Sequence, residues 1–329
     1  MEEARQFLLK LKLQVSLPIR MKKHMPKVWR LNIKTAAKES VDPRMFCIEK
    51  GVLGVGWQVD YDKTPVSWKT YYKLAMAEYY DIEDRDNGWW PAVNAVKNRM
   101  SVDDLCWTRT WQGVYYLGRI TSEWRYETGK EHEDADVVNV RDCDWKQVGS
   151  VESVPGKVVN SFIPPRTAQR IKSRAVTAFS QHMYNSLSQD FKYPMPAQSR
   201  DLFSLISSED CEDVIGLYLQ ALGYSIIPSS CKSDTLAYEY VLKHRKTGRQ
   251  AVVQAKNGNV PLDAEEYADF PGEVYLFTSR GKYLGSPPDN VHCIERRTLE
   301  DFIKNNHQVL PKRIQAWIDI CNELGSGGE

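Results

Sequence analysis

The spacing of apolar and polar residues predicts a helix followed by a hairpin in the last third of the chain. A helix is indicated by SSEDCEDVIGLYLQALGY, with Ser207 or Ser208 as N-cap and Gly223 as the stop. A β-hairpin is indicated by the alternation on both sides of Thr247-Gly248 in LAYEYVLKHRKTGRQAVVQAK. Two further strands are predicted at EVYLFTS and NVHCIER, and closing helices at TLEDFIKNN and LPKRIQAWIDICNEL.

The chain before about residue 165 has a different pattern. Short alternating runs bounded by Gly, Asp or Thr occur in MFCIEKGVLGVGWQVD, DLCWTRT and GVYYLGRITSEW, a spacing typical of a mostly β domain. One helix is expected within VSWKTYYKLAMAEYY, and a linker helix within PPRTAQRIKSRAVTAFSQHMYNSLSQDF. We therefore divide the chain into a basic arm (1–27), a β domain (28–165), a linker helix (166–200) and a C-terminal domain (201–324).

Basic residues lie along the predicted linker helix. Arg166, Arg170, Lys172 and Arg174 could contact a nucleic-acid backbone, although a solvated helix face is the commoner explanation of such residues. The chain as a whole gives no argument for a polyanionic partner, because its formal net charge is only +1 over 329 residues. Any attraction to nucleic acid must therefore come from a local basic surface.

Composition excludes several classes of protein. Hydrophobic residues make up 42% of the chain and charged residues 26%, which rules out a disordered or fibrous protein. No stretch is apolar for long enough to cross a membrane, so we expect a protein without a membrane partner. Seven Cys without a CxxC pair argue against a disulfide scaffold or a zinc site, and with no secretory signal the expected location is cytoplasmic.

The predicted hairpin carries the residues best suited to chemistry. Glu239 lies on its first strand, and Gln254 and Lys256 lie two apart on the second, so the last two point to one face of the sheet. A carboxylate with a neighbouring oxygen ligand can hold Mg²⁺, and a lysine beside it can position or deprotonate an attacking water. This set suits hydrolysis of a phosphodiester bond. The alternative is a cross-strand ion pair on an exposed sheet face.

The segment AYEYVLKHRKTGRQAVVQAK, with the helix before it, resembles the PD-(D/E)xK nuclease superfamily and, within it, the Mrr-like restriction endonucleases with a QxK motif. The resemblance covers about residues 205–280. It implies an α/β/α domain with a mixed sheet, and a catalytic set of Glu212, Glu239, Gln254 and Lys256. Glu239 and Gln254 would be ligands of Mg²⁺ or Mn²⁺. The family usually has Asp where Glu239 stands, so Asp234 is the alternative metal ligand.

The phrase MSVDDLCWTRTWQGVYYLGRITSEWRY resembles the PUA-like superfamily, which includes the EVE and YTH domains. This weaker resemblance implies a small β-barrel that accepts an extruded base of RNA or modified DNA in an aromatic pocket. The segment GVGWQV is similar to one wall of that pocket in EVE-type domains. Individual pocket residues cannot be assigned from the resemblance, and the candidates for base contact are Trp57, Trp89, Trp90, Trp107, Arg109 and Trp111.

Taken together, these resemblances imply an α+β and α/β protein with a PUA-like recognition domain and a magnesium-dependent endonuclease domain. The expected substrate is DNA, modified or unmodified, in restriction or antiphage defence. A homodimer or a larger defence complex is expected, because cutting both strands with one site per chain requires two chains. Two alternatives remain open: a catalytically inactive nucleic-acid-binding adaptor, and an RNA-directed binding protein or nuclease.

Overall fold

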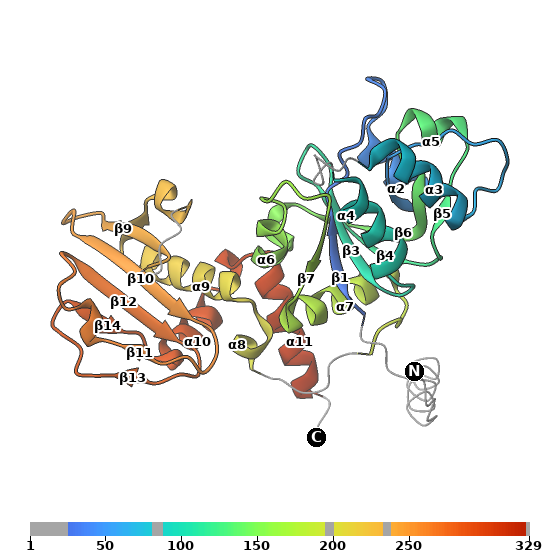
Figure 1. The fold of residues 1–329 in the computed structure, drawn as a ribbon. Coiled ribbons are helices and arrows are strands. Elements are labelled where there is room, and N and C mark those ends of the chain that lie inside the picture. Colours follow the sequence, from blue (N-terminus) through green and yellow to red (C-terminus); the bar gives the residue numbers. More distant parts are fainter. Residues whose placement is uncertain (1–25, 81–87, 195–200, 233–237, 327–329) are drawn as a thin grey trace, which may run out of the picture.

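The structure, a computed structural model, describes residues 26–80, 88–194, 201–232 and 238–326. It is a mixed α and β protein whose described residues form ten α-helices and two main sheets, arranged as two lobes (Figure 1). None of the helices in these ranges combines the length and the apolar character needed to cross a membrane.

The sheet of the N-terminal lobe is curled into a half-barrel. Its strand order is β2-β6-β4-β3-β1-β7, and β5 pairs with β6. Only the pair β1 and β3 is parallel. The strands are β1 (Val28–Leu31), β2 (Val52–Val55), β3 (Leu105–Arg109), β4 (Tyr115–Ile120), β5 (Arg125–Tyr126), β6 (Asn139–Gly149) and β7 (Ala168–Ile171). Since β2 and β7 end this path without pairing with each other in the described residues, the sheet observed there is a half-barrel and the expected closed barrel is not confirmed.

Short helices cover this sheet. They are α2 (Pro43–Glu49), α3 (Trp68–Tyr79), α4 (Trp89–Asn94), α5 (Lys130–Asp134) and α6 (Gly156–Asn160). The predicted helix in VSWKTYYKLAMAEYY is confirmed as α3, which begins at the N-cap Ser67. Its Tyr71 is fully buried beside Trp89, in the core that also contains Trp29.

The segment predicted as a linker helix is divided between a strand and a helix. Strand β7 pairs antiparallel with β1, so residues 168–171 belong to the N-terminal sheet. Helix α7 (Arg174–Ser188) begins at the N-cap Ser173 and packs on β6 and β4. The prediction of one helix over 166–200 is therefore wrong in its extent, because backbone pairing with β1 favours an extended segment before the helix.

The C-terminal lobe confirms the predicted hairpin and strands. Its sheet has the order β14-β12-β10-β9-β8, with β9 antiparallel to β10, and β10, β12 and β14 parallel. The strands are β8 (Tyr224–Ile226), β9 (Tyr240–His244), β10 (Gln250–Lys256), β12 (Glu273–Thr278) and β14 (Val291–Cys293). The turn between β9 and β10 uses Gly248 at φ +69°, a conformation that glycine adopts without strain.

Among the described residues, α-helices cover one face of this sheet, so the α/β/α arrangement expected from the sequence is wrong there. The helices α9 (Ser208–Ala221) and α10 (Arg296–Asn305) contact each other over the same face. The opposite face is covered by the small pair β11 (Leu262–Asp263) and β13 (Tyr283–Leu284) and by a short 3₁₀ turn at Glu265–Tyr267. The connection from β10 to β12 contains Pro261 and Pro271, which limit helix formation there.

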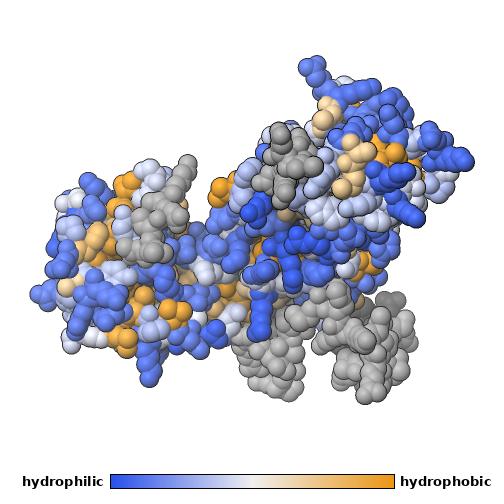
Figure 2. Space-filling model, viewed as in Figure 1, coloured by the Kyte–Doolittle hydropathy of each residue, from blue (hydrophilic) through white to orange (hydrophobic). Residues whose placement is uncertain are grey.

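One hydrophobic core runs through both lobes. It joins Leu117 of the N-terminal sheet, Phe179 of α7, Val214 of α9 and Trp317 of α11 (Lys312–Ser326). The surface narrows between the lobes on the face seen in Figure 2. The remaining helix, α8 (Leu202–Leu205), packs against α7 and α11 beneath this junction. The two lobes are thus packed against each other directly.

Candidate active site and base pocket

The hairpin places three of the predicted catalytic side chains together. Glu239 immediately precedes β9, and its backbone N–H donates to the Val253 carbonyl at 2.7 Å, so it lies opposite Gln254. The Gln254 side-chain amide donates to Glu239 Oε1 at 3.3 Å. Lys256 Nζ lies 3.9 Å from the same carboxylate oxygen. The three groups meet because residues 239, 254 and 256 share one face of the pleated hairpin.

Glu212 of helix α9 approaches Glu239 of this group. This helix begins with a capping box in which Ser207 and Asp210 bond reciprocally to each other's backbone N–H groups. The Tyr240 hydroxyl donates to the Glu212 carbonyl at 3.0 Å and ties the helix to the start of β9. Glu212 and Glu239 then line one cavity of about 390 Å³. Glu239 therefore connects the hairpin residues with the helix residue.

The electrostatics of this site favour the binding of a cation. Burial, together with the carboxylates of Glu239 and Glu209, raises the pKa of Glu212 to about 8. Burial also raises the pKa of Glu239, against the influence of the Lys256 ammonium. Two carboxyl groups whose ionisation is disfavoured in this way would both be stabilised by a positive ion between them.

One buried atom at the site has no partner. Gln254 is only 2% exposed, and its Oε1 atom makes no hydrogen bond within the described residues. An amide oxygen and two carboxylates are hard oxygen donors of the kind that Mg²⁺ prefers. In the described ranges no three His, Cys, Asp or Glu side chains form a metal-binding group, so the candidate donor set needs the Gln254 oxygen. Glu212, Glu239 and Gln254 fit a divalent ion in their chemistry.

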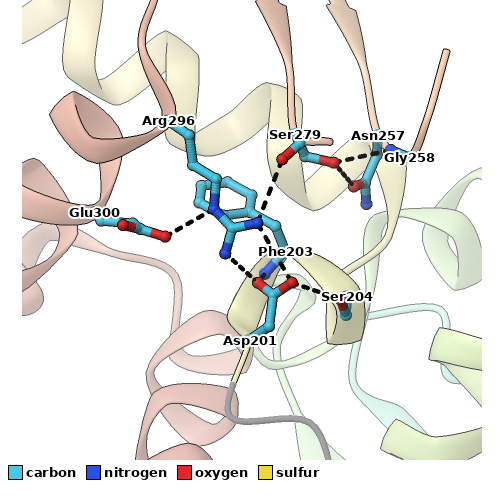
Figure 3. A network of polar contacts seen from close by, with 8 residues as sticks. All are labelled: Asp201, Phe203, Ser204, Asn257, Gly258, Ser279, Arg296 and Glu300. Atoms are coloured by element: carbon cyan, nitrogen blue, oxygen red, sulfur yellow. Dashed lines mark hydrogen bonds and ion pairs between the residues drawn. The ribbon is translucent and has the colours of Figure 1, made fainter. Parts of the chain in front are cut away.

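A polar network fixes the end of β10, where Lys256 lies (Figure 3). The backbone N–H of Ser279 donates to the Lys256 carbonyl at 3.1 Å, and the Ser279 hydroxyl donates to Asn257 at 2.7 Å. Arg296 donates to the Ser279 carbonyl and pairs with Asp201 at 2.6 Å. The carboxyl end of β10 is thus held in place by groups from β12, α10 and the start of α8.

The N-terminal lobe contains a second cavity, of about 410 Å³, at the end of β2. Trp57 and Tyr79 line it, and Gln58 and Asp136 provide polar groups. Trp57 has φ +66°, a left-handed conformation in which the Tyr71 hydroxyl donates to its carbonyl. The cavity therefore combines aromatic walls with hydrogen-bonding groups, as ligand pockets commonly do.

Asp136 is held against the strand end by backbone and side-chain donors. Its carboxylate accepts from the Ala36 N–H at 3.0 Å and from the Gln58 amide at 3.3 Å. Gly56 is required here, because a Cβ at that position would lie 2.1 Å from the carboxylate. Burial raises the pKa of Asp136. Asp136 is therefore an acceptor poised to receive a further donor from a ligand.

Two of the six candidates for base contact are core residues, and for them the prediction is wrong. Trp107 is fully buried, and its indole N–H donates to the Ser180 hydroxyl at 3.0 Å. Trp89 is 2% exposed, and its indole N–H donates to the Tyr71 hydroxyl at 3.1 Å. Both residues pack inside the sheet and helix layers, where large aromatic side chains bury the most apolar area.

The other candidates reach the surface at different places. Of the six candidates, Trp57 is the one that lines the N-terminal cavity. Trp90 is 39% exposed and belongs to helix α4. Trp111 is 66% exposed on the turn between β3 and β4. Arg109 is half-buried, with its guanidinium 4.9 Å from the Phe162 ring. Trp57 is therefore the candidate that the structure places in a pocket.

Sequence reasoning missed several residues of both sites. Tyr79 and Asp136 line the N-terminal cavity with Trp57, although they are far from it in sequence. Glu152 of the N-terminal lobe lines the acidic cavity, and Arg313 of α11 pairs with Asp210 at 2.6 Å beside it. No local motif marks these residues, because tertiary packing, within the N-terminal lobe for the first cavity and between the lobes for the second, brings them together. Asp234 and residues 1–25 of the basic arm lie outside the described residues.

Comparison with models of protein families, with curated proteins and with solved structures finds no match to this chain.

Proposed function

We propose that the protein is a metal-dependent endonuclease whose C-terminal lobe resembles the PD-(D/E)xK nucleases. The observation that carries this proposal is the buried, unpartnered Oε1 of Gln254 beside the carboxylate of Glu239 and the ammonium of Lys256. A buried amide oxygen without a partner typically costs about 1–3 kcal/mol of stability, and a structural ion pair between Glu239 and Lys256 does not explain it. Coordination of a metal ion by this oxygen would explain it.

Each residue has a distinct role in this proposal. Glu239 and Gln254 hold Mg²⁺ or Mn²⁺, and Glu212 supports them as a second acid. When bound, the ion polarises the phosphoryl oxygen and offsets the charge that develops in the transition state. Lys256 orients the attacking water and balances the negative charge of Glu239. The fixed end of β10 keeps the Lys256 backbone in position for this task.

The proposed role of the N-terminal lobe is recognition of a base, in a PUA-like manner. The cavity at Trp57 offers aromatic surface for stacking, which contributes roughly 1–3 kcal/mol per base. The carboxylate of Asp136 is an acceptor for the exocyclic amino group of a base. Together these features support modification-dependent restriction or antiphage defence on DNA. The proposal also includes two chains in the active assembly and a cytoplasmic location.

The direct test incubates the purified protein with Mg²⁺ or Mn²⁺ and with unmodified, methylated or hydroxymethylated DNA, alongside RNA. We expect cutting of DNA that depends on the metal and on Lys256. Preferential cutting of RNA would favour the RNA-directed alternative. Binding without cutting under every condition would favour the inactive adaptor and contradict the proposed activity.

A further inference from the structure

Four arginines gather on the N-terminal lobe, and we call them the arginine cluster: Arg30 of β1, Arg44 of α2, Arg109 of β3 and Arg166 before β7. The guanidinium carbons of Arg30 and Arg109 lie 5.5 and 4.9 Å from the same Phe162 ring. The Arg30 guanidinium also donates to the Arg166 carbonyl. Arg30 and Arg109 thus lie on the same aromatic ring, and the hydrogen bond from Arg30 to a backbone carbonyl places the segment of Arg166 next to them.

Arg44 extends the cluster towards an exposed aromatic ring. Its guanidinium carbon lies 3.8 Å from the centroid of the Trp111 ring, which is 66% exposed. Burial lowers the pKa of Arg44, and the positive charge of Arg109 adds to this effect. Arg109 therefore lies within electrostatic reach of Arg44 on one side and of Arg30 on the other.

These positive charges are not neutralised by ion pairs in the described part of the chain. Within the described residues none of the four side chains forms an ion pair with a carboxylate. Arg30 is fully buried, yet it donates only to neutral oxygens, including the Ser161 carbonyl at 2.7 Å. The carboxylate of Asp42 raises the pKa of Arg44, but it accepts from backbone N–H groups as the N-cap of α2. Clustered, partly desolvated cations of this kind are stabilised by an anion.

The arginine cluster borders the cavity at Trp57. Arg44 donates to the carbonyl of Ile33 at 3.0 Å, and Arg166 directly precedes Thr167 in the chain. Ile33 and Thr167 both line that cavity, as does the exposed Lys34. The cavity and the arginine cluster therefore share adjoining segments of the chain, so that a polyanion with one unit in the cavity would lie near the arginines.

We propose that the arginine cluster binds the phosphate backbone of the nucleic acid whose base enters the Trp57 cavity. This inference rests on the proposed recognition of nucleic acid and does not require the chain to cut it. Arg109 and Arg166 reach the surface and contact phosphates directly. The buried Arg30 and Arg44 supply fixed positive charge beneath them, because Arg30 keeps a pKa of about 10 and stays cationic at neutral pH.

The test measures the salt dependence of binding by the full chain. Fluorescence anisotropy with a labelled DNA duplex, in EDTA to prevent cutting, compares the unaltered protein with Arg109→Gln/Arg166→Gln. The matched control is Arg280→Gln/Arg297→Gln, at exposed positions of the C-terminal lobe. For duplex DNA the slope of log K against log salt changes by about 0.9 for each phosphate contact. We expect the slope of the cluster variant to be shallower by about 1.8 and that of the control to be unchanged.

A second variant guards against misfolding, because Arg109 packs on Phe162. Arg166→Gln alters only an exposed side chain, and we expect its slope to be shallower by about 0.9. Unchanged slopes in both cluster variants, or a full chain that binds no nucleic acid, would overturn this proposal. A full chain that binds with the expected slopes but never cuts would overturn the nuclease activity and leave the arginine cluster standing.

Discussion

The two lobes present opposite charges at their candidate sites. The C-terminal site gathers the carboxyl groups of Glu212 and Glu239 around one nearby cation, Lys256, and burial raises the pKa of both acids. The arginine cluster gathers four cations without an ion-paired carboxylate in the described part of the chain. In the functions proposed above, a small cation would complete the acidic site, whereas a polyanion would complete the arginine cluster. A nucleic acid with a bound metal ion would supply positive charge to the acidic site and negative charge to the arginine cluster.

The largest effect is expected when the acidic site loses Lys256, the cation beside Glu239. Lys256→Ala should lower the cleavage rate by roughly 10²–10⁴-fold, because the attacking water loses the group that orients it. Binding of nucleic acid should not change. The measurement is single-turnover cleavage, with Lys243→Ala on the same hairpin as control. Equal cutting by the Lys256 variant would remove that residue from the mechanism.

A second comparison separates core tryptophans from pocket tryptophans. Trp107→Ala should reduce the free energy of unfolding by about 3–5 kcal/mol, because it leaves a large cavity in the core. Trp57→Ala should instead weaken the binding of nucleic acid by about 1–3 kcal/mol, the usual contribution of stacking. Chemical denaturation and anisotropy distinguish the two. Loss of stability without loss of binding in Trp57→Ala would assign that ring to the core.

Glu212 gives the stability of the protein a particular pH dependence. Its pKa of about 8 in the folded protein is higher than the usual value near 4.5, so the folded state holds the proton more tightly. Stability from this group is therefore complete below about pH 4.5 and is lost as the pH rises through 8. Glu212→Gln should raise the free energy of unfolding at pH 9 by roughly 1–3 kcal/mol, allowing for solvent screening.

The measurement is chemical denaturation at pH 5 and pH 9, with the exposed Glu266→Gln as control. A gain of equal size at both pH values would show that Glu212 acts through packing and not through its charge. A divalent ion should oppose the effect in the unaltered protein, because it favours the ionised carboxylate.

The smallest effect is expected from removing the unpartnered amide oxygen. Gln254→Met should leave stability without metal unchanged or raise it by about 1 kcal/mol, since the buried oxygen is no longer unsatisfied. The same variant should lose stabilisation by Mn²⁺. Thermal unfolding with and without Mn²⁺ measures both, and Gln250→Met at the exposed start of β10 is the control. Clear destabilisation of the metal-free Gln254 variant would indicate a structural role for the amide.

The difference between the lobes also explains how far the sequence could predict them. Glu239, Gln254 and Lys256 belong to one hairpin, where alternation and a Thr247-Gly248 turn define which side chains meet. The cavity at Trp57 joins residues from 33 to 167, and pairing across that distance leaves no local pattern. Trp89 and Trp107 were misassigned for the same reason, because exposure depends on which helices cover the sheet.

The fold shows the same limit. Helix α9 was predictable from its spacing and its cap, and the hairpin from its turn. The strands β11 and β13, which lie on the second face of the C-terminal sheet, could not be predicted, because they pair over only two residues each. The half-barrel shape of the N-terminal sheet could not be predicted either, because it depends on pairing between strands that are far apart in the sequence. Residue spacing, helix caps and turn residues thus predicted the individual helices and strands well, but they predicted poorly how these elements pack together.

The most direct test of the central claim is a crystal of the protein soaked in Mn²⁺ and measured at the manganese absorption edge. We predict an anomalous peak in direct coordination with Glu239 and with the Oε1 atom of Gln254, close to Glu212 and Lys256. A well-ordered site without such a peak, with the Gln254 oxygen bonded to a protein group instead, would contradict the account.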